Sequence, residues 1–140
     1  MKVMFDTCVI LDALQDRYPF NAEANVLIKM AGANVFTACI TAKSITDIYY
    51  VSHRATHNDK ASREIITGLY KLFDIVDTCA IDCRKAIPSK INDYEDAIMV
   101  ETALRENIDL IVTRNTKDYI NSPVKILTPK EFLNVLYTNN

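Results

Sequence analysis

Five aspartates stand at places where a carboxylate could do chemistry. Asp6 ends an apolar, strand-like segment, Asp47 lies within an apolar helical segment, and Asp118 closes a polar segment that follows another apolar strand. Asp93 and Asp96 open a helical segment and are three residues apart, so they share one face of its first turn. Carboxylates that gather at one place repel one another unless a cation neutralises them.

A cluster of this kind predicts chemistry that depends on a hard divalent cation. Ligands that are all oxygen favour Mg²⁺ or Mn²⁺ over zinc. Two such ions, about 3.5–4 Å apart, can activate a water molecule and stabilise the leaving oxygen of a phosphodiester. The chain has only two glycines, Gly32 and Gly68, which excludes the glycine-rich loops that bind phosphate. Phosphate chemistry must therefore use side chains or a metal.

Each acidic position also has a purely structural explanation. Asp6 could cap the helix that follows it, and Asp93 and Asp96 could complement the dipole of their own helix. Asp47 could face solvent beside Lys43, four residues before it. The polar segment 113–118 could be an ordinary solvated loop. These explanations stay open for each residue alone, and the convergence of the acids is what favours a functional site.

Charge and composition limit the partners. Lys and Arg number 16 against 18 Asp and Glu, for a net charge of −2, so nucleic acid would have to bind at a local patch. The basic stretch 53–63, Arg84, Lys85, Lys90 and Arg114 are candidates, and Arg114 adjoins the acidic residues. The N-terminus is no signal peptide, and no segment approaches the roughly 20 apolar residues of a membrane span. We expect a cytoplasmic protein with reduced cysteines.

Short apolar strands alternate with helices along the chain. We expect strands at 2–6, 34–40, 73–76, 110–112 and 124–127, and helices at 8–15, 21–30, 41–53, 58–72, 81–87, 93–106 and 129–137. Asn21, Thr41, Asn58, Asn92 and Thr128 are the expected helix caps. This alternation is typical of the α/β class, with a parallel sheet covered by helices on both faces. A ligand would bind beyond the carboxyl ends of the strands, in one domain of residues 1–140.

These segments resemble the PIN-domain family, which includes the VapC-type toxins of bacterial toxin–antitoxin pairs. The likeness covers nearly the whole chain and is carried by the segments Val3–Leu11, Ile45–Ile48, Asp93–Ala97 and Leu110–Tyr119. The resemblance implies a three-layer α/β/α sandwich with a central parallel sheet. It also implies ribonuclease activity that depends on a divalent metal.

The resemblance also implies roles for particular residues. Metal-binding carboxylates would be Asp6, Asp96 and Asp118, with Asp93 as a further acid. Asp47 falls where the family usually has Glu, and its side chain is shorter by about one C–C bond. The catalytic set is therefore Asp6, Asp47, Asp96 and Asp118. Supporting residues are Thr7, Thr113, Arg114 and Asn115, of which Thr7 and Asn115 would position ligands or water through hydrogen bonds.

The sequence thus predicts hydrolysis of RNA phosphodiester bonds with Mg²⁺ or Mn²⁺, through two ions. The apolar helices, notably 45–51, could form a surface that binds an antitoxin or a second copy of the chain. The alternative is a PIN-like module that binds RNA or protein without cutting it. Two features favour it: Asp47 stands where the family usually has Glu, and the net charge of the chain is slightly negative. Other phosphoryl-transfer folds fit less well: a haloacid-dehalogenase-like phosphatase would need a second acid at Cys8.

Overall fold

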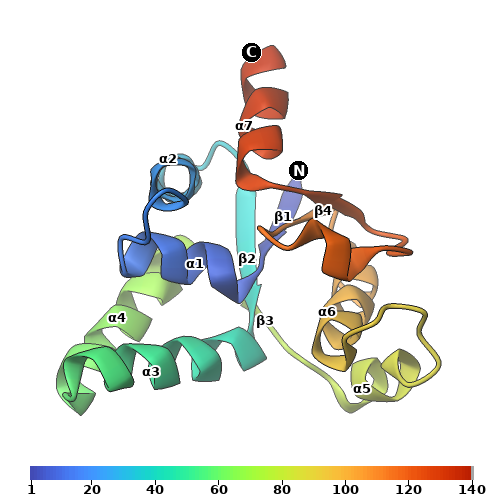
Figure 1. Ribbon diagram of the computed structural model, residues 1–140, viewed down its shortest axis with the longest axis horizontal. Coiled ribbons are helices and arrows are strands. Elements are labelled where there is room, and N and C mark those ends of the chain that lie inside the picture. The colour runs from blue at the N-terminus through green and yellow to red at the C-terminus, as the bar shows by residue number, and fades with distance from the viewer. Residues whose placement is uncertain (140) are drawn as a thin grey trace.

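The computed structural model describes residues 1–139 and has a parallel sheet of five strands at its centre (Figure 1). The strands are β1 (Lys2–Phe5), β2 (Thr37–Thr41), β3 (Asp74–Val76), β4 (Leu110–Val112) and β5 (Lys125–Leu127). Their order across the sheet is β3-β2-β1-β4-β5, so β1 lies in the middle and pairs with β2 on one side and β4 on the other. The expected parallel sheet is confirmed.

Helices cover both faces of this sheet, which makes the expected three-layer α/β/α sandwich. They are α1 (Thr7–Leu14), α2 (Asn21–Gly32), α3 (Ala42–Thr56), α4 (Asp59–Leu72), α5 (Ala80–Ala86), α6 (Tyr94–Arg105) and α7 (Pro129–Thr138). In Figure 1, α1 to α4 lie to the left of the sheet, and α5 and α6 lie to its right. Within residues 1–139, no helix has both the length and the apolar character needed to cross a membrane.

Two hydrophobic clusters hold the layers together, one on each face. Alternate residues of β1 divide between them: Val3 and Phe5 belong to the cluster beneath α1–α4 and α7, and Met4 belongs to the cluster beneath α6. Side chains alternate between the faces of a strand, so the residue after Phe5 points to the α6 side. That residue is Asp6.

The strand order reverses between β1 and β4, and this reversal creates the crevice. From β1 the chain moves outward to β2 and β3, then crosses to the other side of β1 to form β4 and β5. The connecting segments diverge at such a point, which leaves an opening beyond the carboxyl ends of the two strands. Asp6 follows β1 there, and its amide donates to the Val112 carbonyl at 2.9 Å. Thr113 follows β4 at the same edge.

The ends of the helices agree with the sequence at three caps and differ at two. Thr41, Asn58 and Thr128 each accept a hydrogen bond from the first turn, as predicted. Helix α2 is instead preceded by Phe20, because the Asn21 side chain donates to Asp16 at 2.9 Å. Helix α6 is capped by Asp93 rather than Asn92. The expected loop 113–118 contains a short 3-10 helix, η1 (Thr116–Tyr119).

Candidate active site

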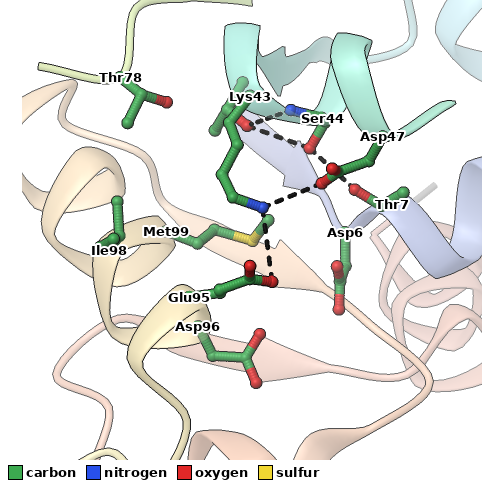
Figure 2. A pocket seen from close by; sticks show the side chains of 11 residues that line it. Asp6, Thr7, Lys43, Ser44, Asp47, Thr78, Glu95, Asp96, Ile98 and Met99 are labelled. Atoms are coloured by element: carbon green, nitrogen blue, oxygen red, sulfur yellow. Dashed lines mark hydrogen bonds and ion pairs between the residues drawn. The ribbon is translucent and has the colours of Figure 1, made fainter. Parts of the chain in front are cut away.

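A polar crevice opens at the carboxyl edge of the sheet, between α3 and α6. It encloses about 120 Å³ and receives side chains from both layers (Figure 2). Its lining residues are Asp6, Thr7, Thr41, Lys43, Ser44, Asp47, Thr78, Glu95, Asp96, Ile98 and Met99. Three of the five aspartates singled out in the sequence therefore line one cavity, although they are up to ninety residues apart in the chain.

Asp6 turns its carboxylate into the crevice and does not use it as a helix cap. It occupies the cap position of α1, but its side chain accepts no hydrogen bond from the first turn of that helix. Its Oδ2 accepts instead from Thr113 Oγ1 at 2.7 Å and from the Tyr119 hydroxyl at 3.3 Å. The two neutral donors fix the carboxylate without neutralising its charge. The capping explanation of Asp6 is therefore wrong.

Asp96 faces Asp6 across the Tyr119 hydroxyl, which also donates to Asp96 Oδ1 at 3.1 Å. Burial above all, together with the charges of Asp6, Asp93 and Asp118, raises the pKa of Asp96 to about 6, against the opposing hydrogen bond from Tyr119. The same surroundings, burial first, hold the pKa of Tyr119 far above its ordinary value, so its hydroxyl stays protonated. The single hydroxyl proton of Tyr119 is thus shared between two carboxylates that repel each other.

Asp93 and Asp118 act on Asp96 from outside the cavity. Asp93 Oδ1 accepts from the Asp96 amide at 3.1 Å as the cap of α6, so the structural explanation holds for this residue. Asp118 lies in η1, one residue before Tyr119. Neither lines the cavity, but both charges raise the pKa of Asp96. Negative charge at this end of α6 is therefore greater than the two facing carboxylates alone supply.

Asp47 lies on the α3 side of the crevice and has a cationic partner. Its Oδ2 accepts from Lys43 Nζ at 2.9 Å, the pairing that the sequence left open. Lys43 Nζ also lies 3.5 Å from Glu95 Oε2 of α6, so one ammonium group joins the two walls (Figure 2). Burial opposes its charged form, but the hydrogen bonds and charges of the two acids raise the pKa of Lys43 above its ordinary value.

Hydroxyl groups tie the starts of α1 and α3 together behind the acids. Thr7 Oγ1 donates to Ser44 Oγ at 2.9 Å, and Thr41 Oγ1 donates to the same oxygen at 3.0 Å. On the β4 side, the backbone N–H of Asn115, not its side chain, donates to Thr113 Oγ1 at 3.1 Å, and Thr113 in turn holds Asp6. Thr7, Thr113 and Asn115 therefore support the walls of the crevice through hydrogen bonds.

Arg114 points away from the crevice. Its guanidinium donates to both carboxylate oxygens of Asp12, at 2.7 and 3.1 Å, and lies 4.3 Å from the centre of the Phe20 ring. Asp12 is only 1% exposed, so this ion pair is a structural link between α1 and the segment after β4. In the stretch 53–63, Arg63 likewise pairs with Asp59, at 2.8 Å.

The crevice fits a hard divalent cation, although its protein ligands are few. Asp6 and Asp96 face each other, and neither forms an ion pair with a cationic side chain among residues 1–139. In the same residues, no group of three or more His, Cys, Asp or Glu side chains could by itself hold a metal ion. Mg²⁺ commonly binds through one or two carboxylates, with waters and substrate phosphates completing its octahedron. The donor set meets that requirement.

Sequence reasoning missed four residues of this site. Tyr119, Lys43 and Glu95 make the contacts described above, and Thr78 supplies a buried hydroxyl with no hydrogen-bond partner within residues 1–139. The position of Tyr119 gave one signal: it is a large aromatic residue one place after an acid, close behind an apolar strand. Lys43 was named only as a solvent-facing partner of Asp47, because nothing local indicated its contact with Glu95, fifty-two residues away.

Comparison with known proteins gives a consistent result. The family profile described as PIN domain matches residues 2–117. VapBC2 from Rickettsia felis, solved with a DNA fragment from its promoter, is similar with a TM-score of 0.68 and 17% identity, covering 91% of this chain and 98% of that one. A toxin–antitoxin complex from Klebsiella pneumoniae has a TM-score of 0.67 and 20% identity, covering 91% and 97%. VapBC-1 from nontypeable Haemophilus influenzae has a TM-score of 0.68 and 14% identity, covering 93% and 99%.

At these identities the solved structures support the fold alone, and no curated protein matches the chain in sequence. The family profile extends over most of the chain and includes the strands that carry Asp6 and Thr113, as well as the helix that carries Asp96. The chain belongs to the PIN-domain family.

Proposed function

We propose that this protein is an endoribonuclease that depends on Mg²⁺ or Mn²⁺. The observation that carries the proposal is the facing pair Asp6 and Asp96, which share the Tyr119 hydroxyl at the reversal point of the sheet. Within residues 1–139 this carboxylate pair has no ion-pair partner, and burial first, then the charge of Asp6, raises the pKa of Asp96. A divalent cation would remove the repulsion between the two carboxylates and thereby bind with a favourable free energy.

In this proposal Asp6 and Asp96 are the ligands that the chain contributes, and Asp93 and Asp118 add negative charge around them. Thr113 and Tyr119 hold the two carboxylates in place, so little ordering is needed when the site is loaded. A divalent ion bound there supplies Lewis-acid polarisation of a phosphodiester and of the attacking water. Asp47, on the opposite wall, would accept a proton or orient the substrate through its free oxygen.

The substrate and partners form part of the proposal as well. RNA is the expected substrate, in the cytoplasm, and an antitoxin is the expected protein partner. Support for the antitoxin comes from the neighbouring structures, whose descriptions name VapBC and toxin–antitoxin complexes. The antitoxin would inhibit cleavage by covering the crevice or its rim.

The direct test compares RNA cleavage by the wild type with cleavage by Asp6→Asn and Asp96→Asn, each with Mn²⁺ and with EDTA. Total RNA is the substrate, and new 5′ ends are mapped by sequencing. We expect cleavage only by the wild type and only with metal. Glu64→Gln, at an exposed carboxylate of α4, is the matched control and should cleave normally. Undiminished cleavage by either Asn variant would refute the proposal.

A module that binds without cutting is the second candidate, and one observation favours it. Asp47 stands where the family usually has the longer Glu and is engaged by Lys43 at 2.9 Å. A thermal-shift titration separates the two candidates, because a ligand that binds only the folded state raises its stability. Stabilisation by millimolar Mn²⁺ that Asp96→Asn abolishes favours the nuclease, and no response in the wild type favours the binding module.

A further inference from the structure

Lys43 crosses the crevice between two layers of the fold. Its ammonium group lies 2.9 Å from Asp47 Oδ2 on α3 and 3.5 Å from Glu95 Oε2 on α6. In Figure 2 its side chain extends from the start of α3 over the cavity toward Glu95, while Asp6 and Asp96 lie beyond it. The positive charge therefore stands within the crevice rather than on the outer face of α3.

Local helix energetics do not explain this placement. Lys43 is the second residue of α3, and a cation is unfavourable at a helix N-terminus because the dipole is positive there. Its i,i+4 pairing with Asp47 runs in the weaker order, with the cation ahead of the acid. The contact with Glu95, whose side chain is 72% exposed, joins Lys43 to the other wall and adds little stability. Lys43 is thus placed to serve the crevice.

The lysine makes the two halves of the crevice differ in charge. The half formed by Asp47 and Glu95 contains a cation already. The half formed by Asp6 and Asp96 has only the neutral donors Thr113 and Tyr119 among residues 1–139. A divalent ion entering the first half would have to displace the ammonium group or lie against it. An ion entering the second half would meet two carboxylates that have no ion-pair partner within residues 1–139.

We infer that Lys43 takes the place of a second metal ion, so that the crevice binds one divalent cation, at Asp6 and Asp96. The inference rests on the proposed function for the existence of that first ion, and it replaces the two ions that the family resemblance implies. The ammonium group is tethered and always present. It supplies positive charge on the α3 side of the cavity.

The test counts bound Mn²⁺ per chain by equilibrium dialysis and by the EPR signal of free Mn²⁺, at pH 8. The wild type should bind one ion in the crevice, which Asp96→Asn removes. Lys43→Met should bind two, with the second ion held about tenfold or more tightly than by the wild type, because one unit charge has left its site. Lys43→Arg keeps the charge and should bind one. Adding Asp47→Asn to Lys43→Met should return the count to one.

Each outcome decides the matter. Two crevice ions in the wild type, or one in Lys43→Met, overturns the inference while leaving a metal-dependent nuclease intact. No Mn²⁺ bound by the wild type, with Asp96→Asn indistinguishable from it, overturns the proposed function and the inference together. Circular dichroism checks the fold of each variant. If Lys43→Met does not fold, Lys43→Gln, which keeps most of the side chain, takes its place.

Discussion

Replacing Asp96 by Asn should stabilise the metal-free protein even though it removes a ligand from the site. In the native state the Asp96 carboxylate is partly buried and faces the charges of Asp6, Asp93 and Asp118, whereas in the unfolded chain it is solvated. Asn keeps an oxygen that can accept from Tyr119 and carries no charge. The variant therefore removes the cost of burying a charge and the repulsion by neighbouring acids, neither of which the unfolded state has.

The size of the effect follows from the pKa. A rise from 3.8 to about 6 disfavours the ionised form in the folded protein by about 3 kcal/mol at pH 8. Solvent reaches part of this carboxyl, so screening reduces the usable amount to about 1–2 kcal/mol. The variant also loses the attraction between the Asp96 charge and the N-terminus of α6, which reduces its gain in stability by about 0.5 kcal/mol. We expect a net gain of about 1 kcal/mol, or a rise in Tm of about 3–4 °C.

The assay is thermal and urea denaturation at pH 8 in EDTA, with Glu64→Gln as the control for loss of one exposed negative charge. With excess Mn²⁺ the order should reverse, because only the wild type gains stability from the ion. An Asp96→Asn variant that is less stable than the wild type in EDTA would refute the reasoning, since it would mean that the carboxylate is stabilised by its surroundings rather than strained by them.

Three other predictions concern the pH dependence of Asp96 and two ion pairs outside the crevice. Because the folded pKa of Asp96 is raised, its contribution to the stability of the metal-free protein is fully present below about pH 4 and is lost as the pH rises to about 6. A proton on Asp96 competes with the metal, so the Mn²⁺ affinity measured by calorimetry should rise about tenfold per pH unit up to about pH 6 and then level off. Asp12→Ala leaves Arg114 unpaired and should cost about 3 kcal/mol in urea denaturation. Arg105→Met removes two hydrogen bonds from buried Asp82, which joins α5 to α6, and should cost about 2–3 kcal/mol.

Controls for these three use the same chain. Mn²⁺ affinity that is flat between pH 5 and pH 7 would show that no proton competes with the metal. Arg17→Ala removes the long 3.9 Å contact with Asp12 and two hydrogen bonds to Gln15 near the surface, and it should cost about 1 kcal/mol or less. An equal loss in both variants would contradict the ranking. Thr102→Val removes a single hydrogen bond from Asp82, so it should cost less than Arg105→Met.

The sequence was sufficient to predict the sheet and most of the helices. Leu110–Val112 is an apolar run too short for a helix, and Thr128 with Glu131 forms a capping box that begins α7. Cap positions next to two competing polar residues were less certain. At Asn92 and Asp93 either side chain could accept, and the tertiary position of Tyr94, whose hydroxyl donates to the Cys83 carbonyl at 2.7 Å, favours the later start.

The candidate site was predictable where alternation along a strand fixes direction and unpredictable where partners come from distant segments. Asp6 points to the α6 side because Phe5 points the other way. By contrast, the pairing of Arg114 with Asp12 joins residues 102 positions apart, and nothing in either segment distinguishes that pairing from an RNA contact. Tyr119 reaches two acids only because η1 turns its hydroxyl back toward β1, which a loop assignment for 113–118 does not foresee.

The two hydrophobic clusters on opposite faces of the sheet have a consequence for breathing motions. Asp6 directly follows β1 of the sheet, while Asp96 is carried by α6, over the smaller cluster. If the α5–α6 layer lifts as a unit, Asp96 moves away from Asp6 without disturbing the other face. An ion bound to both carboxylates opposes this separation. Amide hydrogen exchange should therefore slow across α6 when metal is added and stay unchanged in α2.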